Sequence, residues 1–287
     1  MQNSSICLFD PNDEISTVEE FLKSYQLSKA FLKKEIPKKY LQKKVRHKDK
    51  LEFSLNVFNV GMIHPEYSDK EIRVLYEDEN FLVISKPERV HCHPLSYLES
   101  NNCLSFLRSR GYGEVLRVNK DHYDRGLLFR LDFETSGVLF FTKKESIYEQ
   151  VRGDFQQVMK EKFYLAIVSN EIEESGTLIN VISTKGKTVK EDEKGVTAEI
   201  SFEKIGSNDK YSLIKIKLGH GHRHQIRAQL KLNGTPILGD TLYGGEESER
   251  VWLHALSYEI VINEDEVIKV SDTPELFFSF LNLNSDL

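Results

Sequence analysis

The stretch FRLDFETSGVLFFTK, residues 129–143, sets a polar turn directly before a run of apolar residues. The run, residues 137–143, is almost continuously apolar, which is typical of a strand buried on both faces. The turn carries a carboxylate, Asp132, two residues after a cation, Arg130, which would keep that carboxylate ionised. A carboxylate on a turn beside a core strand is well placed to face a cleft, so Asp132 is the first candidate site residue.

A purely structural interpretation of the same turn stays open at this point. Ion pairs in turns are common, so Arg130 and Asp132 could simply pair with each other. The hydroxyls of Thr135 and Ser136 could then satisfy the backbone amides of the turn. The spacing of these residues alone does not separate this interpretation from a catalytic one.

The patterns on either side of the apolar run predict an α+β fold. Upstream, IRVLYEDENFLVISKP, residues 72–87, predicts two short strands joined by a turn at 77–80. The other predicted elements are strands at 162–168 and 211–219 and helices at 98–110 (closed by Gly111 and Gly113), 145–160 and 222–232. Because strands and helices do not alternate regularly, we expect a mixed, mostly antiparallel sheet with flanking helices.

The first part of the chain differs from the rest in its patterning. Residues 15–35 carry a rough apolar stripe that predicts a short helical region, with a serine or threonine cap at its start and Pro37 as its stop. Residues 50–70 are expected to be a connector, because glycine, proline and serine interrupt any period there. The predicted domains are therefore residues 1–70 and residues 71–287.

Charge is unevenly distributed along the chain. The formal net charge is −6, which argues weakly against a nucleic-acid partner. Between Lys23 and Lys50, however, eleven lysines and arginines are opposed only by Glu35 and Asp49. Such a segment could attract phosphates, or it could be no more than a solvated helix face, and the charge pattern leaves both open.

Cysteine usage and hydropathy exclude several classes of protein. Three cysteines are too few for a disulfide scaffold and no pair has metal-ligand spacing, which favours a reducing, cytoplasmic setting. The N-terminal stretch lacks the basic start and apolar core of a secretory signal. No apolar run is long enough to span a bilayer, so we expect no membrane partner.

The second candidate site is GHGHRHQIR, residues 219–227, which holds three histidines at alternate positions. Alternate positions share a face only on a strand, whereas a helix is expected to begin here, and no carboxylate or cysteine completes a ligand set. We therefore predict no metal. Arg223 and Arg227, one turn apart at a helix N-terminus, instead suit the binding of phosphate or carboxylate.

Three further features have a structural interpretation beside any functional one. Tyr164 lies inside a predicted strand, where a tyrosine usually packs in the core with its hydroxyl hydrogen-bonded. The segments 239–245 and 253–255 are predicted to be turn-like and polar. Within the second, a lone His254 is more often a satisfied core residue than a site residue.

Taken in order, these segments resemble the RluA-type family of bacterial pseudouridine synthases, from about Ile72 to about Glu259. The matching motifs are LYEDENFLVISKP followed by His93-Pro94, then Phe129 to Gly137, Lys162 to Ala166, Gly221 to Arg227, and Pro236 to Gly244. Two positions depart from the family pattern: Phe129 replaces a histidine, and His222 replaces the first arginine of the basic motif. Residues 1–70 faintly resemble an RNA-binding module of the ribosomal-protein S-four type.

The resemblance implies a pseudouridine synthase fold and an isomerase that converts specific uridines of ribosomal or transfer RNA to pseudouridine without a cofactor. It implies that Asp132 is the catalytic carboxylate, which either attacks the sugar or removes a proton from it. Arg227 would be its basic partner. Tyr164 would stack on the uracil and help to remove the proton from carbon 5.

The implied partner is RNA, bound by a monomer that flips the target uridine out of its stack. The residues expected to contact substrate or RNA are Arg130, Thr135, His222, Arg223, His224, Gln225, Ile226 and Leu230. The basic segment from Lys23 to Lys50 would add attraction to phosphates that does not depend on sequence.

Three other functions remain as alternatives. The chain could be a catalytically inactive RNA-binding protein with the same fold. It could be a metal-dependent hydrolase built on His220, His222 and His224. It could also be a glycoside hydrolase that uses Asp132 and Glu134 as a carboxylate pair.

Overall fold

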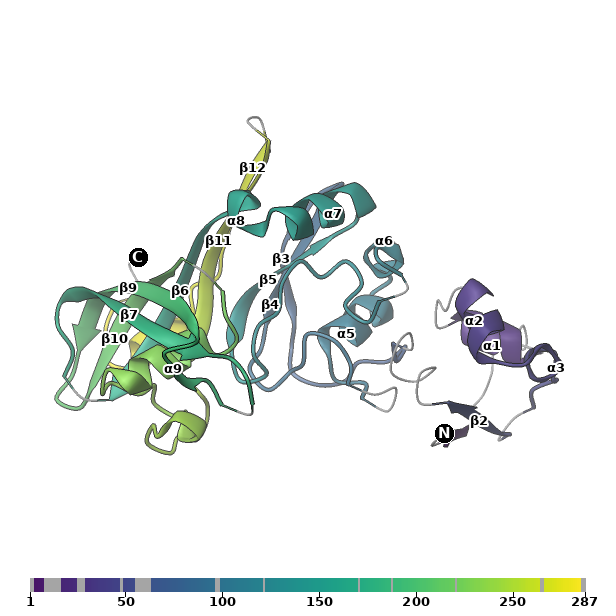
Figure 1. Cartoon of the computed structure of the whole chain (residues 1–287), viewed down its shortest axis with the longest axis horizontal. Coiled ribbons are helices and arrows are strands. Elements are labelled where there is room, and N and C mark those ends of the chain that lie inside the picture. The colour runs from purple at the N-terminus through teal and green to yellow at the C-terminus, as the bar shows by residue number, and fades with distance from the viewer. Residues whose placement is uncertain are drawn as a thin grey trace.

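The computed structural model describes residues 3–7, 17–24, 29–46, 49–54, 63–95, 99–120, 122–169, 171–186, 188–219, 221–263 and 266–284. Within these residues, one large sheet with its helices forms the main body, and a smaller group of short helices with a two-stranded sheet lies at the N-terminal end of the chain (Figure 1). The predicted α+β class is confirmed.

The main sheet has ten strands among the described residues, in the order β3-β4-β5-β11-β6-β10-β9-β7-β8, with β12 paired to β11. The strands are β3 Arg73–Glu77, β4 Phe81–Lys86, β5 Ser136–Thr142, β6 Met159–Ser169, β7 Ser175–Ser183, β8 Lys190–Glu191, β9 Val196–Ser207, β10 Tyr211–Leu218, β11 Leu253–Asn263 and β12 Glu266–Ser271. Strands β5 and β11 run parallel, and the other pairs are antiparallel. The sheet is therefore mixed and mostly antiparallel, as the sequence predicts.

The parallel pairing of β5 with β11 explains the glycine that ends the polar turn. Gly137 has φ +115°, and a Cβ placed on it would lie 2.2 Å from the carbonyl oxygen of Ala255. No other residue type fits both the conformation and the close approach of β11. The turn that carries Asp132 is thereby fixed to the centre of the sheet.

Helices cover the sheet and complete its core. They are α5 Cys103–Ser109, α6 Gly113–Arg117, α7 Glu145–Gly153, α8 Phe155–Val158, α9 Gln225–Leu232, the 3₁₀ turn η1 Thr241–Tyr243, and α10 Glu275–Phe280. Helix α9 packs on β7 and β9, where Ala228 joins a cluster with Ile182 and Ala198. None of the described helices is long and apolar enough to cross a membrane.

The N-terminal group has a hydrophobic cluster of its own. Helices α1 Val18–Ser24, α2 Lys29–Glu35 and α3 Lys38–Leu41 accompany β1 Asn3–Cys7, which pairs antiparallel with β2 Lys50–Ser54. The cluster buries apolar residues of the helices, of β2 and of the segments between them, namely Val18, Phe21, Leu22, Leu32, Ile36, Leu41, Val45, Leu51 and Phe53. Thr17 caps α1, because its hydroxyl accepts from the Glu20 amide while the Glu20 carboxylate accepts from the Thr17 amide.

The predicted helix at 145–160 is wrong in its second half. Asp154 ends α7 and its side chain accepts a hydrogen bond from the Gln157 amide, which starts the separate short helix α8. Strand β6 then begins at Met159. An acidic residue that satisfies a free amide can thus end one helix and begin the next.

Three other sequence-based boundaries need correction. The predicted connector at 50–70 contains β2, because Leu51 and Phe53 supply two alternate apolar residues to the N-terminal cluster. Gly113 does not close a helix but begins α6. Residues 253–255, predicted to be turn-like, begin the buried strand β11.

Candidate active site

A small cavity brings together the three residues for which the sequence predicts catalysis. Asp132 from the turn before β5, Tyr164 from β6 and Arg227 from α9 all line this cavity, which has a volume of about 90 Å³. A larger cavity of about 460 Å³ adjoins it. The two cavities share six lining residues, Arg130, Asp132, Tyr164, Leu218, Gly221 and His222.

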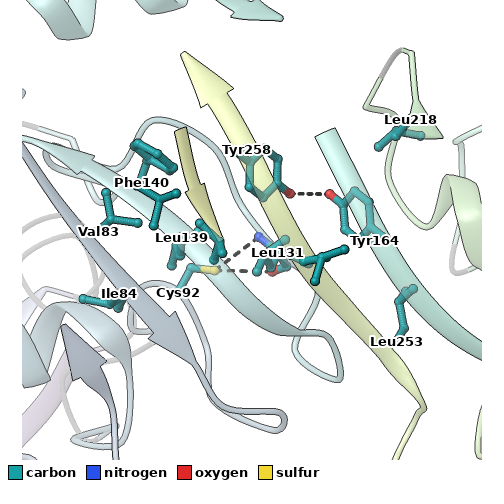
Figure 2. Packing of buried hydrophobic residues seen from close by; sticks show 14 of the residues in the cluster. Val83, Ile84, Cys92, Leu131, Leu139, Phe140, Tyr164, Leu218, Leu253 and Tyr258 are labelled. Atoms are coloured by element: carbon teal, nitrogen blue, oxygen red, sulfur yellow. Dashed lines mark hydrogen bonds between the residues drawn. The ribbon is translucent and has the colours of Figure 1, made fainter. Parts of the chain in front are cut away.

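The backbone on both sides of Asp132 is held by hydrogen bonds. Before it, the Cys92 thiol donates to the Leu131 carbonyl at 3.3 Å and accepts from the Leu131 amide at 3.4 Å (Figure 2). After it, the Phe133 carbonyl accepts from the Arg89 amide at 2.7 Å and from the buried Lys86 ammonium at 3.3 Å. The carboxylate is therefore presented from a rigid turn, which suits a group that must meet a substrate in one geometry.

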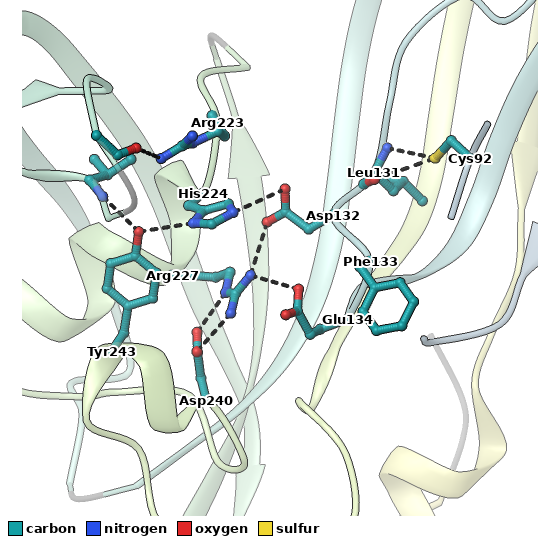
Figure 3. A network of polar contacts seen from close by, with 12 residues as sticks. Cys92, Leu131, Asp132, Phe133, Glu134, Arg223, His224, Arg227, Asp240 and Tyr243 are labelled. Atoms are coloured by element: carbon teal, nitrogen blue, oxygen red, sulfur yellow. Dashed lines mark hydrogen bonds and ion pairs between the residues drawn. The ribbon is translucent and has the colours of Figure 1, made fainter. Parts of the chain in front are cut away.

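Arg227 is the cation that contacts Asp132. Its Nη1 lies 3.3 Å from Asp132 Oδ2 and 3.0 Å from Glu134 Oε2 (Figure 3). Its Nε and Nη2 donate to the two carboxylate oxygens of buried Asp240, at 2.7 and 2.8 Å. One guanidinium, itself buried, thus joins three carboxylates.

These contacts also decide the charge of Arg227. Burial acts to lower the pKa of Arg227, but the hydrogen bonds and negative charge of Asp240, with those of Asp132 and Glu134, outweigh it and raise that pKa. The guanidinium therefore stays charged. Gly239 sets up the turn that places Asp240, since it has φ +82° and an added Cβ would lie 1.7 Å from the Arg250 carbonyl oxygen.

His224 lies on the other side of Asp132, in a left-handed conformation with φ +50° at the start of α9. Its Nδ1 lies 3.0 Å from the Tyr243 hydroxyl, which also accepts from the Val189 amide at 2.8 Å. The arrangement that satisfies all three groups has the hydroxyl donating to Nδ1, which places the ring proton on Nε2. That nitrogen lies 3.8 Å from Asp132 Oδ1.

His224 is neutral in this setting. Burial lowers the pKa of His224, and the charges of Arg227 and Arg223 act in the same direction against the opposing charge of Asp132. A neutral ring with its proton on Nε2 presents a donor toward the carboxylate without adding a second positive charge.

Tyr164 presents its ring to both cavities, while its hydroxyl is hydrogen-bonded to the hydroxyl of Tyr258 (Figure 2). The prediction of a bonded hydroxyl is confirmed. Burial raises the pKa of Tyr164, so its side chain is a neutral phenol at pH 7. Phe129, which departs from the family pattern, packs its ring 4.5 Å from that of Tyr258.

Arg130 does not pair with Asp132 among the described contacts. It is exposed, and its Nη1 lies 3.5 Å from the Tyr123 hydroxyl. The structural interpretation of the turn as an Arg130–Asp132 pair is therefore wrong, because the partner of Asp132 comes from α9, far along the chain.

The other predicted contact residues fall into three groups. Thr135, Gln225 and Ile226 are buried and line the small cavity only. Exposed Arg223 lines the larger cavity, and its Nη2 donates to the Gly186 carbonyl at 2.5 Å. Leu230 is wholly buried in the hydrophobic core and lines neither cavity.

The histidine cluster and the core histidine differ in their surroundings. His220 lies outside the described residues, and among the residues that are described no group of three or more His, Cys, Asp or Glu side chains could hold a metal ion. His254 is buried between the Ser136 hydroxyl and the Asp272 carbonyl, each 2.8 Å from a ring nitrogen. The prediction that His254 is a satisfied core residue is confirmed.

Sequence reasoning missed the residues that organise this site from a distance. Asp240 and Tyr243 lie in a segment predicted to be a polar turn, and the only sequence signal for them was their place in the motif Gly239 to Gly244. Tyr258 and Lys162, which line the larger cavity, had no such role assigned.

Comparisons with known proteins agree on one family. The family described as RNA pseudouridylate synthase matches residues 80–232. An uncharacterized RNA pseudouridine synthase of Mycoplasma pneumoniae is 30% identical over 71% of this chain and 66% of its own length, so the chain spans just under two thirds of it. The ribosomal large subunit pseudouridine synthase D of Borreliella burgdorferi is 28% identical over 81% of this chain and 74% of its own.

A solved structure shows the same fold. Human RNA pseudouridylate synthase domain containing 1 superimposes with a TM-score of 0.58 at 24% identity, over 71% of this chain and 84% of that one. The matched family segment contains the Asp132 turn, the Tyr164 strand and the Arg227 helix.

Proposed function

This chain belongs to the RNA pseudouridylate synthase family, and we propose that it isomerises specific uridines of ribosomal or transfer RNA to pseudouridine. The observation that carries the proposal is the convergence of Asp132, Tyr164 and Arg227, from three separate elements, on one cavity. The reaction breaks the bond between uracil nitrogen 1 and the sugar and forms a bond from carbon 5 to the same sugar carbon. Carbon 5 loses a proton and nitrogen 1 gains one, so no oxidant or reductant is needed.

In this proposal Asp132 supplies the reactive carboxylate. It either attacks the sugar or removes a proton from it, and both roles require an ionised side chain with an open approach. Arg227 holds one carboxylate oxygen, while the other faces His224. Asp240, clamped on two nitrogens of Arg227, keeps the guanidinium from swinging away.

Tyr164 would retain the uracil while it is detached from the sugar. Stacking of a base on an aromatic ring contributes about 1–3 kcal/mol, which favours retention over escape. Because burial keeps its hydroxyl protonated, Tyr164 would not act as a phenolate base toward carbon 5, and its hydroxyl stays hydrogen-bonded to that of Tyr258.

The target uridine must leave its stack before it can reach a carboxylate in a cavity. Arg130, exposed at the rim, is positioned to fill the gap or hold a phosphate, and the lining residues His222 and Ile226 would contact the flipped nucleotide. Residues 1–70 would act as a basic RNA-binding region beside a catalytic domain of residues 71–287. The buried free thiols Cys92 and Cys103 fit the cytoplasmic setting that goes with this proposal.

Replacement of Asp132 by asparagine tests the assignment, because the amide keeps the shape and removes the charge. Asp132→Asn should lower tritium release from RNA labelled at carbon 5 of uridine by about 10⁴-fold or more, as expected for loss of a reactive side chain. The matched control is Glu134→Gln, which removes the other carboxylate on the same Arg227 nitrogen and should cost far less. Turnover by Asp132→Asn at a rate near that of the unmodified chain would refute the role of Asp132.

A further inference from the structure

The larger cavity differs in charge from the small one that it adjoins. Its lining holds four permanent or near-permanent cations, Arg130, Arg152, Lys162 and Arg223. Asp132 is the one carboxylate among the described residues that line it, and it already contacts Arg227. A cavity of about 460 Å³ with this excess of positive charge is within the size range of ligand sites and suits an anion.

Lys162 is the most unusual of these cations. Only 3% of it is exposed, yet among the described residues it forms no ion pair. Its ammonium donates to the Gly219 carbonyl at 2.7 Å and lies 5.4 Å from the centre of the Phe155 ring. Burial lowers the pKa of Lys162. Keeping this ammonium charged at a buried position therefore reduces the stability of the folded chain.

Arg152 faces the same cavity from α7. About half of its side chain is exposed, and its Nη2 lies 4.0 Å from Asp124, at the outer limit of an ion pair. The hydrogen bonds of Asp124 with Asn119, at 2.9 Å, and with His122, at 2.6 Å, are made by its other oxygen, Oδ1. Because the contact of Arg152 with Asp124 is long and its side chain is half exposed, Arg152 can turn toward an anion in the cavity at little cost.

We propose that Lys162 and Arg152 form a phosphate subsite, which binds the RNA backbone next to the target uridine. This inference rests on the proposed function. Asp132 and Tyr164 line both cavities, so an anion in the larger cavity would lie next to a uridine that reacts in the small one. The rings of Phe129 and Phe155 in the same wall favour a nucleotide, with its sugar and base, over a free anion. Charge-assisted hydrogen bonds to phosphate would offset the burial of Lys162.

The test is a measurement of RNA binding as a function of salt, which requires no turnover. The probes are a fluorescein-labelled single-stranded pentauridylate and the same oligomer with uncharged methylphosphonate linkages. Each lost phosphate contact on a single strand should reduce the slope of log affinity against log salt by about 0.7. Arg152→Ala and Lys162→Met should each show this reduction with pentauridylate and no change with the uncharged oligomer.

Matched controls separate this effect from a general loss of charge or of folding. Lys210→Ala removes an exposed cation that lines neither cavity and should leave the slope unchanged. Because Arg152 is half exposed, Arg152→Ala should fold even if Lys162→Met does not, which circular dichroism would establish. Asp132→Asn should keep the salt dependence of the unmodified chain. Loss of isomerase activity would then test the proposed function, and loss of salt dependence in Arg152→Ala would test the subsite, so the two can be distinguished.

Three outcomes would overturn the subsite. One is a slope in Arg152→Ala equal to that of the unmodified chain. A second is an equal loss of affinity for the charged and uncharged oligomers. The third is binding of inorganic phosphate at micromolar concentration that disappears in Lys162→Met, which would identify a site for a free anion instead of RNA.

Discussion

The Arg227 side of the site, which is the small cavity, and the Lys162 side, which is the larger cavity, differ in how their buried cations are paired. On the Arg227 side, one buried guanidinium contacts three carboxylates, those of Asp132, Glu134 and Asp240. On the Lys162 side, a buried ammonium has a carbonyl and an aromatic ring as its partners among the residues that the structure describes. The charge of Arg227 is balanced without a ligand, whereas the charge of Lys162 is not balanced by its described partners.

This difference indicates a division of labour. Groups that take part in bond breaking must be fixed before the substrate arrives, and a saturated network fixes them. Groups that hold the RNA backbone need unsatisfied charge to offer, which costs stability in the empty protein. The Arg227 side therefore fits chemistry, and the Lys162 side fits binding.

The largest difference in stability between the two sides should appear when each cation is replaced by methionine. Arg227→Met leaves three carboxylates without their cation and should destabilise the fold by about 3–5 kcal/mol. Lys162→Met removes a buried charge for which the described part of the chain offers no negative partner, so its cost should stay within about 1 kcal/mol. Urea unfolding at pH 7 measures both, and equal losses would mean that the two sides do not differ.

A second prediction concerns His254, which joins the start of β5 to the Asp272 segment. Burial lowers the pKa of His254 from 6.5 to about 4. Only the unfolded chain takes up this proton between those values, so stability is full above pH 6.5 and falls as the pH drops toward 4. The total loss should be about 3 kcal/mol.

Unfolding in urea at pH 7, 6 and 5 checks this dependence. His254→Gln supplies the matched chain without the titrating ring, and its stability should fall less steeply over the same interval. Identical slopes for the two chains would show that His254 is not the group responsible.

The smallest expected effect comes from the link between His224 and Tyr243. Tyr243→Phe removes the hydroxyl that accepts from the Val189 amide and contacts His224 Nδ1, which should cost about 1–2 kcal/mol of stability. Activity should fall only a few-fold, because Arg227 still holds Asp132. Tyr211→Phe, whose hydroxyl bonds the exposed carboxylate of Glu246, is the control and should change stability by less. If Tyr243→Phe lost more activity than Arg227→Met, then His224 and not Arg227 would be the contact of Asp132 that matters more for activity.

Elements with a clear local pattern could be predicted from the sequence. The hairpin of β3 and β4, the apolar strand β5 and the alternating strand β10 all lie where the sequence predicts them. Each has a period, a turn and an apolar face that a short window reveals. The strand β11 was missed because His254 and Ser257 interrupt its apolar pattern, and what makes them tolerable inside the core is contact with distant residues.

The candidate site shows the same division. Motif matches pointed to Asp132, Tyr164 and Arg227, and the structure brings them together. The sequence put Arg130 beside Asp132 because the two are only two positions apart in the chain, but folding supplies Arg227 instead. The clamp of Asp240 on Arg227 spans a helix and a turn, and the open charge of Lys162 depends on which carboxylates are absent nearby, so neither is visible in a linear pattern.

The central claim is that Asp132 drives isomerisation of uridine in cellular RNA, and pseudouridine mapping tests it most directly. Total RNA would be compared from cells that lack this gene and carry either the unmodified chain or Asp132→Asn. We expect one or more modified positions that appear with the unmodified chain and stay absent with Asp132→Asn. The same positions modified by both chains, or no position modified by either, would contradict it.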